Sequence, residues 1–255
     1  MNEDFRGVLL VVCAHDEVNS LRNTVHALQQ ACNPELAVRI VIYLAPHATP
    51  DCLDQAAQLA AQPFTIPVVT MQEQGGALAK EAQRDFKIQQ AQCGASHALF
   101  WTADQDAPAE LAAQMVEQAA LHPAAVIKLS RFLPGGSLPE SKRGFINLRD
   151  ATFRKLVITL YRSKQTDPHF GLSLFPIAPF LRFDLRETFM SFTIEYILCF
   201  ERMGTQFVEL PLHQQDRPEG KSNLKLRHKL RYFWPVLRLR VCRTRNIFKE
   251  EQSHD

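Results

Sequence analysis

The sequence predicts an α/β protein with a mostly parallel β-sheet that is covered by helices on both faces. Short apolar runs alternate along the first half of the chain with longer segments of helical periodicity, as expected for strands joined by crossover helices. The first run, VLLVVC at 8–13, has no polar face, which is typical of a strand buried on both sides of a sheet. The 255 residues, 46% of them hydrophobic, suffice for one large domain with a substantial core.

Strand-and-helix pairs make up the predicted first half of the chain. Each strand is a short apolar run, and each following helix repeats apolar residues at helical spacing. Pro108 suits the first turn of its helix, where the N–H that proline lacks would have no helical partner. The strands are predicted at 8–13, 38–44, 66–70 and 97–101, and the helices at 18–30, 51–61, 77–92 and from about 108.

The second half is less regular. Gly204 stands where a helix C-terminal cap belongs, and the Pro/Gly-rich segment 134–139 is interpreted as an active-site loop within one domain. We therefore predict a single domain over 1–245, which includes a basic amphipathic helix at about 222–245, and a frayed tail at 246–255. The remaining strands are predicted at 125–129, 172–175 and 207–212, and the helices at 151–161 and 189–203.

Charge is distributed unevenly along the chain. The net charge is +2, but residues 217–245 hold ten Lys/Arg and a single acid, whereas the remainder holds 19 basic and 26 acidic residues. A basic C-terminal end on an acidic body predicts an anionic partner there, either lipid or phosphate. Nucleic acid is not expected, because no nucleic-acid-binding motif accompanies the basic run.

The cysteine pattern and the hydropathy bear on cellular location. Six cysteines are scattered without a C-x-x-C pair, so we interpret them as reduced thiols in a cytosolic compartment. No apolar stretch approaches the roughly 20 residues that span a bilayer. The short acidic N-terminus is unlike a signal peptide. Membrane contact is therefore expected to be peripheral, on the cytosolic face, or through a membrane subunit.

Acidic residues follow two of the predicted strands, at the edge where open α/β sheets bind ligands. Asp16 and Glu17 can accept hydrogen bonds from a nucleoside, and capping the next helix is the alternative role. Asp104 and Asp106 can hold Mg²⁺ or Mn²⁺, which take their other ligands from diphosphate and water. For Asp106, helix capping is the alternative.

Basic residues lie in two further loops. Arg131 follows the fifth strand, and paired hydrogen bonds from arginine suit a phosphate monoester. The segment 216–231, DRPEGKSNLKLRHKLR, places Arg217 and Lys221 in a flexible turn that can close over a phosphorylated ligand. A surface loop before a solvated basic helix is the alternative interpretation.

Over roughly residues 8–240 the chain resembles the family 2 glycosyltransferases, and among them the dolichyl- and polyprenyl-phosphate mannosyl or glucosyl synthases. The most specific matches are SRFLPGGS at 130–137, DPHFGLSLF at 167–175 and the basic segment 216–231. The resemblance implies the GT-A fold, a Rossmann-like three-layer sandwich of the nucleotide-diphospho-sugar transferases. It also implies transfer of one sugar from a GDP- or UDP-sugar to a polyprenyl or dolichyl phosphate, assisted by Mg²⁺ or Mn²⁺.

The resemblance further assigns roles to individual residues. Asp104, Asp106 and Arg217 are the expected catalytic residues, and the two aspartates are the expected metal ligands. The expected nucleotide-sugar contacts are Ala14, Asp16, Glu17, Ala45, His47, Gly75, Gly76, Thr102, Ala103, Asp104 and Lys221. The expected contacts to the acceptor phosphate are Arg131, Ser137, Arg143 and Arg149.

The chain departs from the family pattern at positions that face the ligand. The segment 45–51, APHATPD, lacks the paired aspartates of the family's D-D-G-S-T-D, so base contacts would fall to His47, Asp51 or the backbone. Thr102 and Ser173 replace an aspartate and an arginine. These departures keep a second hypothesis open, a catalytically degenerate protein that acts as a binding or regulatory subunit. A transferase with a soluble or protein acceptor is a third.

Overall fold

The computed structural model describes residues 4–73, 78–105, 107–139, 145–168, 170–187, 191–215 and 233–249. In these residues a mixed seven-stranded sheet has the order β3-β2-β1-β4-β6-β5-β7. All neighbouring strands pair in parallel except at β6, which is antiparallel to both β4 and β5. The strands are β1 (Val8–Ala14), β2 (Ala37–Leu44), β3 (Val68–Gln72), β4 (His97–Thr102), β5 (Val126–Ser130), β6 (Ser173–Pro176) and β7 (Phe207–Pro211).

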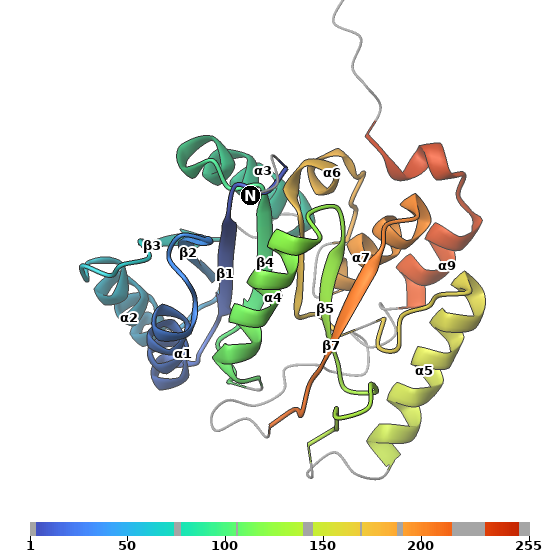
Figure 1. Ribbon diagram of the computed structural model, residues 1–255, viewed down its shortest axis with the longest axis horizontal. Coiled ribbons are helices and arrows are strands. Elements are labelled where there is room, and N and C mark those ends of the chain that lie inside the picture. Colours follow the sequence, from blue (N-terminus) through green and yellow to red (C-terminus); the bar gives the residue numbers. More distant parts are fainter. Residues whose placement is uncertain are drawn as a thin grey trace, which may run out of the picture.

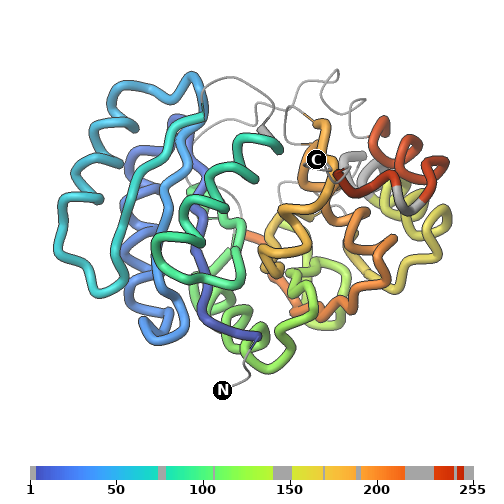
Figure 2. The backbone as a smooth tube through the Cα atoms, turned by 90° about the horizontal axis from the view of Figure 1, so that it is seen from above, coloured from blue at the N-terminus to red at the C-terminus, as the bar shows by residue number. Residues whose placement is uncertain are grey.

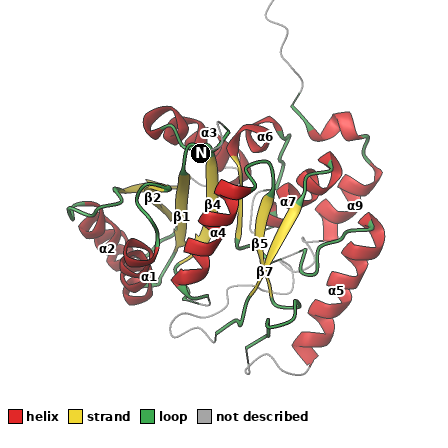
Figure 3. Ribbon diagram, viewed as in Figure 1, coloured by secondary structure: helices red, strands yellow, loops and turns green. Residues whose placement is uncertain are grey.

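Helices cover both faces of this sheet, which gives three layers (Figures 1 and 3). On one face lie α1 (Val18–Ala31), α2 (Pro50–Ala60) and α4 (Ala109–Leu121). On the other lie α3 (Leu78–Cys93), α5 (Phe145–Tyr161), α6 (Ile177–Arg182), α7 (Phe192–Met203) and α9 (Phe233–Val241). Seen from above, α2 and α9 lie at opposite ends of the molecule (Figure 2). The predicted α/β architecture is confirmed.

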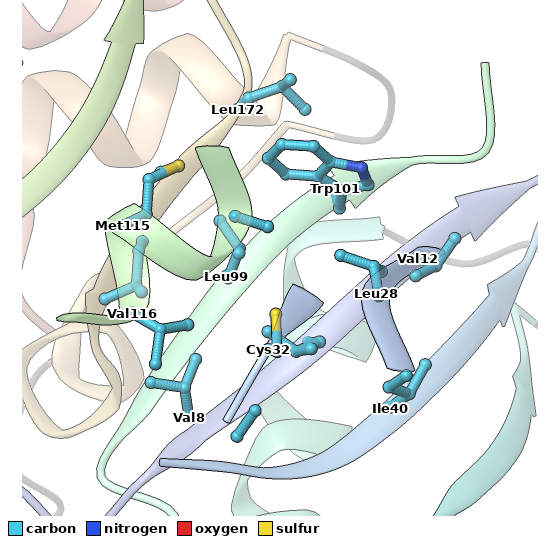
Figure 4. Close-up of a cluster of buried hydrophobic side chains, with 14 of the residues drawn as sticks. Val8, Val12, Leu28, Cys32, Ile40, Leu99, Trp101, Met115, Val116 and Leu172 are labelled. Atoms are coloured by element: carbon cyan, nitrogen blue, oxygen red, sulfur yellow. The ribbon is translucent and has the colours of Figure 1, made fainter. Parts of the chain in front are cut away.

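Alternate residues of each central strand face opposite cores, as the two-residue period of a strand requires. Val8, Val12 and Leu99 pack with Leu28 of α1 and Met115 of α4 in an aliphatic core (Figure 4). The opposite core is rich in aromatic rings, which come from β4, β6, α3, α6 and α7. All residues of β1 except the partly buried Cys13 are buried, which explains why its sequence contains no charged or strongly polar residue.

The predicted strands all occur, each within two residues of its expected ends. The helix predicted at 151–161 begins earlier, at Phe145, and α6 was not predicted, because its six residues follow a proline and lack a repeating pattern. Residues 246–249 were predicted to belong to a frayed tail, but they pack against the rest of the domain. Ile247 is buried, and Phe248 forms a β-bridge with Phe183.

Three further expectations concern the chain as a whole. All six cysteines are free thiols, as predicted. In the part of the chain that the structure describes, no helix is both long and apolar enough to cross a bilayer. The predicted C-terminal helix at about 222–245 is described only from Phe233, where α9 begins, and Pro235 lies in its first turn.

The aromatic core provides a test of the packing. Phe175 is fully buried, with ring centroids 4.9 Å from Phe180, 5.0 Å from Tyr196 and 5.5 Å from Phe100. Phe175→Ala is expected to lower the free energy of unfolding by about 3–5 kcal/mol, because it leaves a cavity among these rings. Leu121→Ala, at a side chain 69% exposed, should change it by less than about 0.5 kcal/mol in the same urea titration. Equal losses would contradict the assignment of Phe175 to the core.

Candidate active site

The loops that follow β1, β2 and β4 are joined by backbone hydrogen bonds at the carboxyl edge of the sheet. The N–H of Ala45 donates to the carbonyl of Ala14, and the N–H of Ala103 donates to the carbonyl of Cys13, both at 3.0 Å. The N–H of Thr49 reaches the carbonyl of His15 at 3.0 Å. Ala14, Ala45 and Ala103, which were predicted from separate motifs, therefore lie at one edge.

Two carboxylates, Glu17 and Asp104, meet between the first and the fourth strand. Glu17 accepts hydrogen bonds from the N–H groups of His15 at 2.8 Å and Asp16 at 3.1 Å, and it also interacts with the side chain of Asp104. Burial alone would raise the pKa of Glu17, but these hydrogen bonds outweigh it and lower the pKa. Asp104 is only 8% exposed. The sequence did not reveal this pairing.

This geometry argues against helix capping, one of the two roles considered for the first acidic motif. Glu17 occupies the N-cap position of α1, yet within the described residues its side chain makes no capping bond to that helix. Its carboxylate turns back toward the preceding loop and Asp104. Asp16 is exposed beside it. The carboxylate of Glu17 therefore lies at the edge of the sheet, and its contact with a nucleoside stays a prediction.

A divalent cation fits the Glu17–Asp104 pair chemically, because Mg²⁺ needs only one or two protein carboxylates when phosphate and water complete its shell. Gln105 adopts a left-handed conformation, with φ 55°, directly after Asp104. Asp106 lies outside the described residues. Among the residues that are described, no group of three or more His, Cys, Asp or Glu could hold a metal. The Asp104–Asp106 metal site thus stays a prediction.

Residues of the loop between β2 and α2 cap the N-terminus of α2. The hydroxyl of Thr49 accepts a hydrogen bond from the N–H of Cys52 at 3.3 Å, and Pro50 takes the first helical position. Asp51 is exposed in the first turn of α2, and His47 is exposed in the loop. At the position of the family's paired aspartates, this chain therefore offers only the exposed imidazole of His47 and backbone groups.

A buried ion pair lies at the end of β5. The Nε and Nη2 atoms of Arg131 donate to the two carboxylate oxygens of Asp167 at 2.7 and 3.0 Å. The guanidinium also stacks on Phe170, with Cζ 4.5 Å from the ring centroid. Asp167 is fully buried and Arg131 is 6% exposed. Asp167 therefore orients the guanidinium of Arg131.

A lysine extends this polar cluster into the core. Lys128 is fully buried on β5, and its Nζ donates to Oε1 of Gln165 at 3.2 Å and to the carbonyl of Asp167 at 3.0 Å. Burial lowers the pKa of Lys128 to about 8, although Asp167 and Glu209 favour its charged form. Glu209 of β7 accepts hydrogen bonds from the N–H groups of Thr166 and Asp167 at 2.8 and 3.2 Å.

The loop 130–137 is attached to the chain that follows β7. The N–H of Ser137 donates to the carbonyl of Leu212 at 2.9 Å, and the N–H of Gln214 donates to the carbonyl of Ser137 at 3.0 Å. The Ser137 hydroxyl contacts Nδ1 of His213. A Cβ on Gly136 would lie 2.7 Å from the carbonyl oxygen of Ser130, so this close approach requires glycine.

His213 and Gln214, which lie near the candidate acceptor loop, were not predicted from the sequence. Oε1 of Gln214 lies 3.5 Å from Nη1 of Arg131. Both residues follow the last strand at its carboxyl end, and that position was the signal that could have identified them. Glu73, directly after β3, was also missed. Burial and the neighbouring Glu81 raise the pKa of Glu73 to about 7.

Several predicted site residues are not placed by the structure. The side chain of Arg149, in α5, is not described. Thr102 ends β4 and is half-buried. The remaining predicted residues, Gly75, Gly76, Asp106, Arg143, Arg217 and Lys221, lie outside the described residues.

Two buried residues, Ser173 and Glu195, have structural roles. Ser173, which replaces the family's arginine, is fully buried, and its hydroxyl lies 2.6 Å from the hydroxyl of Tyr196. Glu195 accepts hydrogen bonds from the N–H groups of Arg186 and Glu187 at 2.9 and 3.0 Å and pairs with Arg238 of α9. The carboxylate of Glu195 is fully buried, so it does not face solvent.

The Arg131–Asp167 pair provides a stability test. Asp167→Asn is expected to lower the free energy of unfolding by about 3–5 kcal/mol, because it leaves a buried guanidinium without its counter-charge. Asp184→Asn is the matched control, since the partner of Asp184, Arg186, has a side chain 60% exposed. That change should cost less than about 1 kcal/mol in urea denaturation. A small, equal effect of both substitutions would contradict a buried pair.

Glu195 predicts a dependence of stability on pH. Burial raises the pKa of Glu195 from 4.5 to about 7, against the opposing effect of its hydrogen bonds and Arg238. Protonation therefore favours the folded state, and this contribution to stability is lost as pH rises from about 4.5 to about 7. Glu195→Gln should flatten that part of the profile, measured by urea denaturation at several pH values. An unchanged slope in the variant would contradict the raised pKa.

Comparison with known proteins identifies the fold. No model of a protein family matches the chain, and no curated protein matches its sequence. Glucosyl-3-phosphoglycerate synthase from Mycobacterium tuberculosis, solved with UDP, is similar over 92% of this chain and 80% of its own, with TM-score 0.64 and 15% identity. The same enzyme solved with Mn²⁺, UDP and phosphoglyceric acid gives TM-score 0.67 and 13% identity over 93% of this chain and 80% of its own. The chain therefore has the predicted GT-A-type α/β fold.

Proposed function

We propose that this protein is a metal-assisted glycosyltransferase that moves one sugar from a nucleotide-sugar to a phosphate-bearing acceptor. The observation that carries the proposal is the meeting of Glu17 and Asp104 at the carboxyl edge of a GT-A-type sheet. Ligands of open α/β sheets bind at this edge. The structural neighbours were solved with UDP and with Mn²⁺ or Mg²⁺, which supports a uridine diphosphate donor over a guanosine one.

The cation would be held by Asp104, with Glu17 or Asp106, and would supply Lewis-acid stabilisation of the departing diphosphate. The rest of the reaction needs little from the protein's side chains. An oxygen of the acceptor phosphate forms the new bond to the anomeric carbon of the sugar. The bond from that carbon to the diphosphate breaks, and the nucleoside diphosphate leaves with the electron pair. Because the acceptor phosphate is already an anion, no general base is required.

For the acceptor we propose polyprenyl or dolichyl phosphate. The motifs at 130–137 and 167–175 support it, and so does the excess of cations over residues 217–245. Phosphoglyceric acid, bound in one neighbour, also bears a phosphate. Arg131 would meet such a phosphate with a guanidinium that Asp167 already orients. Arg143, Arg149 and Ser137 are the further proposed contacts.

One observation favours a second function, a binding protein that has lost catalysis. The loop after β2 carries no carboxylate before Asp51, and its Thr49 is engaged in capping α2. A nucleobase that lost two hydrogen bonds there would bind more weakly, at about 1–3 kcal/mol per unpaired group. Tight binding of a protein partner without any binding of nucleotide would favour this alternative.

The test is the thermal stability of the purified chain with UDP, GDP and their sugar conjugates, with and without Mn²⁺. A ligand that binds the native state raises the melting temperature by mass action. We expect a shift that needs both Mn²⁺ and a uridine nucleotide. Asp104→Asn should abolish the shift, whereas Asp54→Asn, an exposed carboxylate on α2, should retain it. The absence of any shift in the wild type would favour the binding-protein alternative.

A turnover assay distinguishes a lipid phosphate acceptor from a soluble one. With a uridine diphosphate sugar, product is expected on polyprenyl phosphate and not on 3-phosphoglycerate. Asp104→Asn should lower this turnover by at least about 100-fold, as losses of electrostatic stabilisation commonly do. Product on the soluble acceptor alone would reject the lipid acceptor and retain the transferase.

A further inference from the structure

The helix α9 presents an apolar face to solvent. Trp234 is 62% exposed, Leu237 52% and Val241 85%. Phe233 is partly exposed at the start of the same face. Residues 233, 237 and 241 follow one another at four-residue spacing, and residue 234 lies within one turn of them, so all four share one side of the helix.

Contacts on the opposite side hold α9 in this orientation. Val236 and Leu239 are buried in the aromatic core. The hydroxyl of Tyr161 donates to the carbonyl of Val236 at 2.7 Å, and the guanidinium of Arg202 donates to the carbonyl of Leu239. Arg238 pairs with the buried Glu195 of α7. The exposed apolar residues cannot turn inward unless these contacts break, so their exposure follows from how the helix is attached.

The charged residues of the segment that contains this face all have one sign. Residues 233–249 contain Arg238, Arg240, Arg243, Arg245 and Lys249 and no Asp or Glu. Arg240, next to the apolar face, and Arg243, beyond its end, are both exposed. The rest of the chain, outside 217–245, has an excess of acidic residues. A surface that carries negative charge and accepts apolar side chains therefore complements this helix, and an anionic lipid bilayer has both properties.

We propose that α9 docks the protein on an anionic membrane surface, with Trp234, Leu237 and Val241 inserted among the lipid headgroups. The inference deepens the proposed function and rests on it for its purpose, because the phosphate of a polyprenyl phosphate lies at that surface. The contact is superficial, since no helix in the described part of the chain could cross a bilayer. Trp at the interface and flanking Arg are the usual residues of such a contact.

A second copy of the chain fits this face less well. Isologous contact through α9 would bring the arginines of both copies together. The helix has nine residues, whereas a stable dimer commonly buries roughly 800 Å² on each partner. Charge and size therefore both favour lipid.

The experiment uses the full chain with vesicles of phosphatidylcholine alone or mixed with phosphatidylglycerol, without donor or acceptor. The chain has two tryptophans, and Trp101 is only 2% exposed, so changes in emission report on Trp234. We expect flotation with the phosphatidylglycerol vesicles and a blue shift of tryptophan emission, both weakened by high salt. Trp234→Ser combined with Leu237→Ser should weaken flotation at least about tenfold.

Leu121→Ser is the matched control, because Leu121 is an equally exposed apolar side chain on α4 and should leave flotation unchanged. Asp104→Asn should also float like the wild type, so loss of donor binding and loss of membrane docking are measured separately. The proposal is overturned if neither vesicle type floats the protein, or if Leu121→Ser weakens flotation as much as the α9 variant. A dimer that the α9 variant dissociates, without vesicle binding, would assign the face to a second copy instead.

Discussion

The buried ion pair between Arg131 and Asp167 is the interaction on which the arrangement of the candidate site most depends. It joins the end of β5 to the segment before β6, and Gln214 brings the chain after β7 to the same guanidinium. Lys128 and Glu209 contact the backbone around Asp167, so cations and carboxylates alternate through the cluster. Such a cluster stabilises the fold only when every charge keeps its partners, because an uncompensated buried charge is very costly.

This constraint makes the loop 130–137 a preorganised element. Asp167 fixes the guanidinium of Arg131 through two oxygens, and Phe170 packs against its face. The close approach of Gly136 to Ser130 and the hydrogen bonds of Ser137 hold the rest of the loop. A phosphate that met Arg131 would find its orientation already determined, so little conformational entropy would be lost on binding. The same pairing offsets much of the charge of Arg131, which leaves other cations to balance the phosphate.

The strands were predictable because a strand buried on both faces has an almost purely apolar sequence, as in β1 and β2. The antiparallel direction of β6 was not, because no local signal records the direction in which a strand of only four residues enters a sheet. Within the site, the motifs identified Asp104, Glu17, Arg131 and the segment that begins at Asp167, but not which of these residues pair. The contacts Glu17–Asp104 and Arg131–Asp167 join residues far apart in the sequence, and only the fold brings them together.

Glu195 shows how a buried carboxylate can determine structure at a distance from the site. It lies in the first turn of α7, where the helix dipole favours a carboxylate, and it accepts hydrogen bonds from the N–H groups of Arg186 and Glu187. Its pairing with Arg238, together with the burial of Val236 and Leu239, fixes the rotation of α9 about its own axis. That rotation decides which side chains of α9 face the core and which face solvent. The exposed apolar face therefore depends in part on a carboxylate at the start of α7, a contact far from the candidate site.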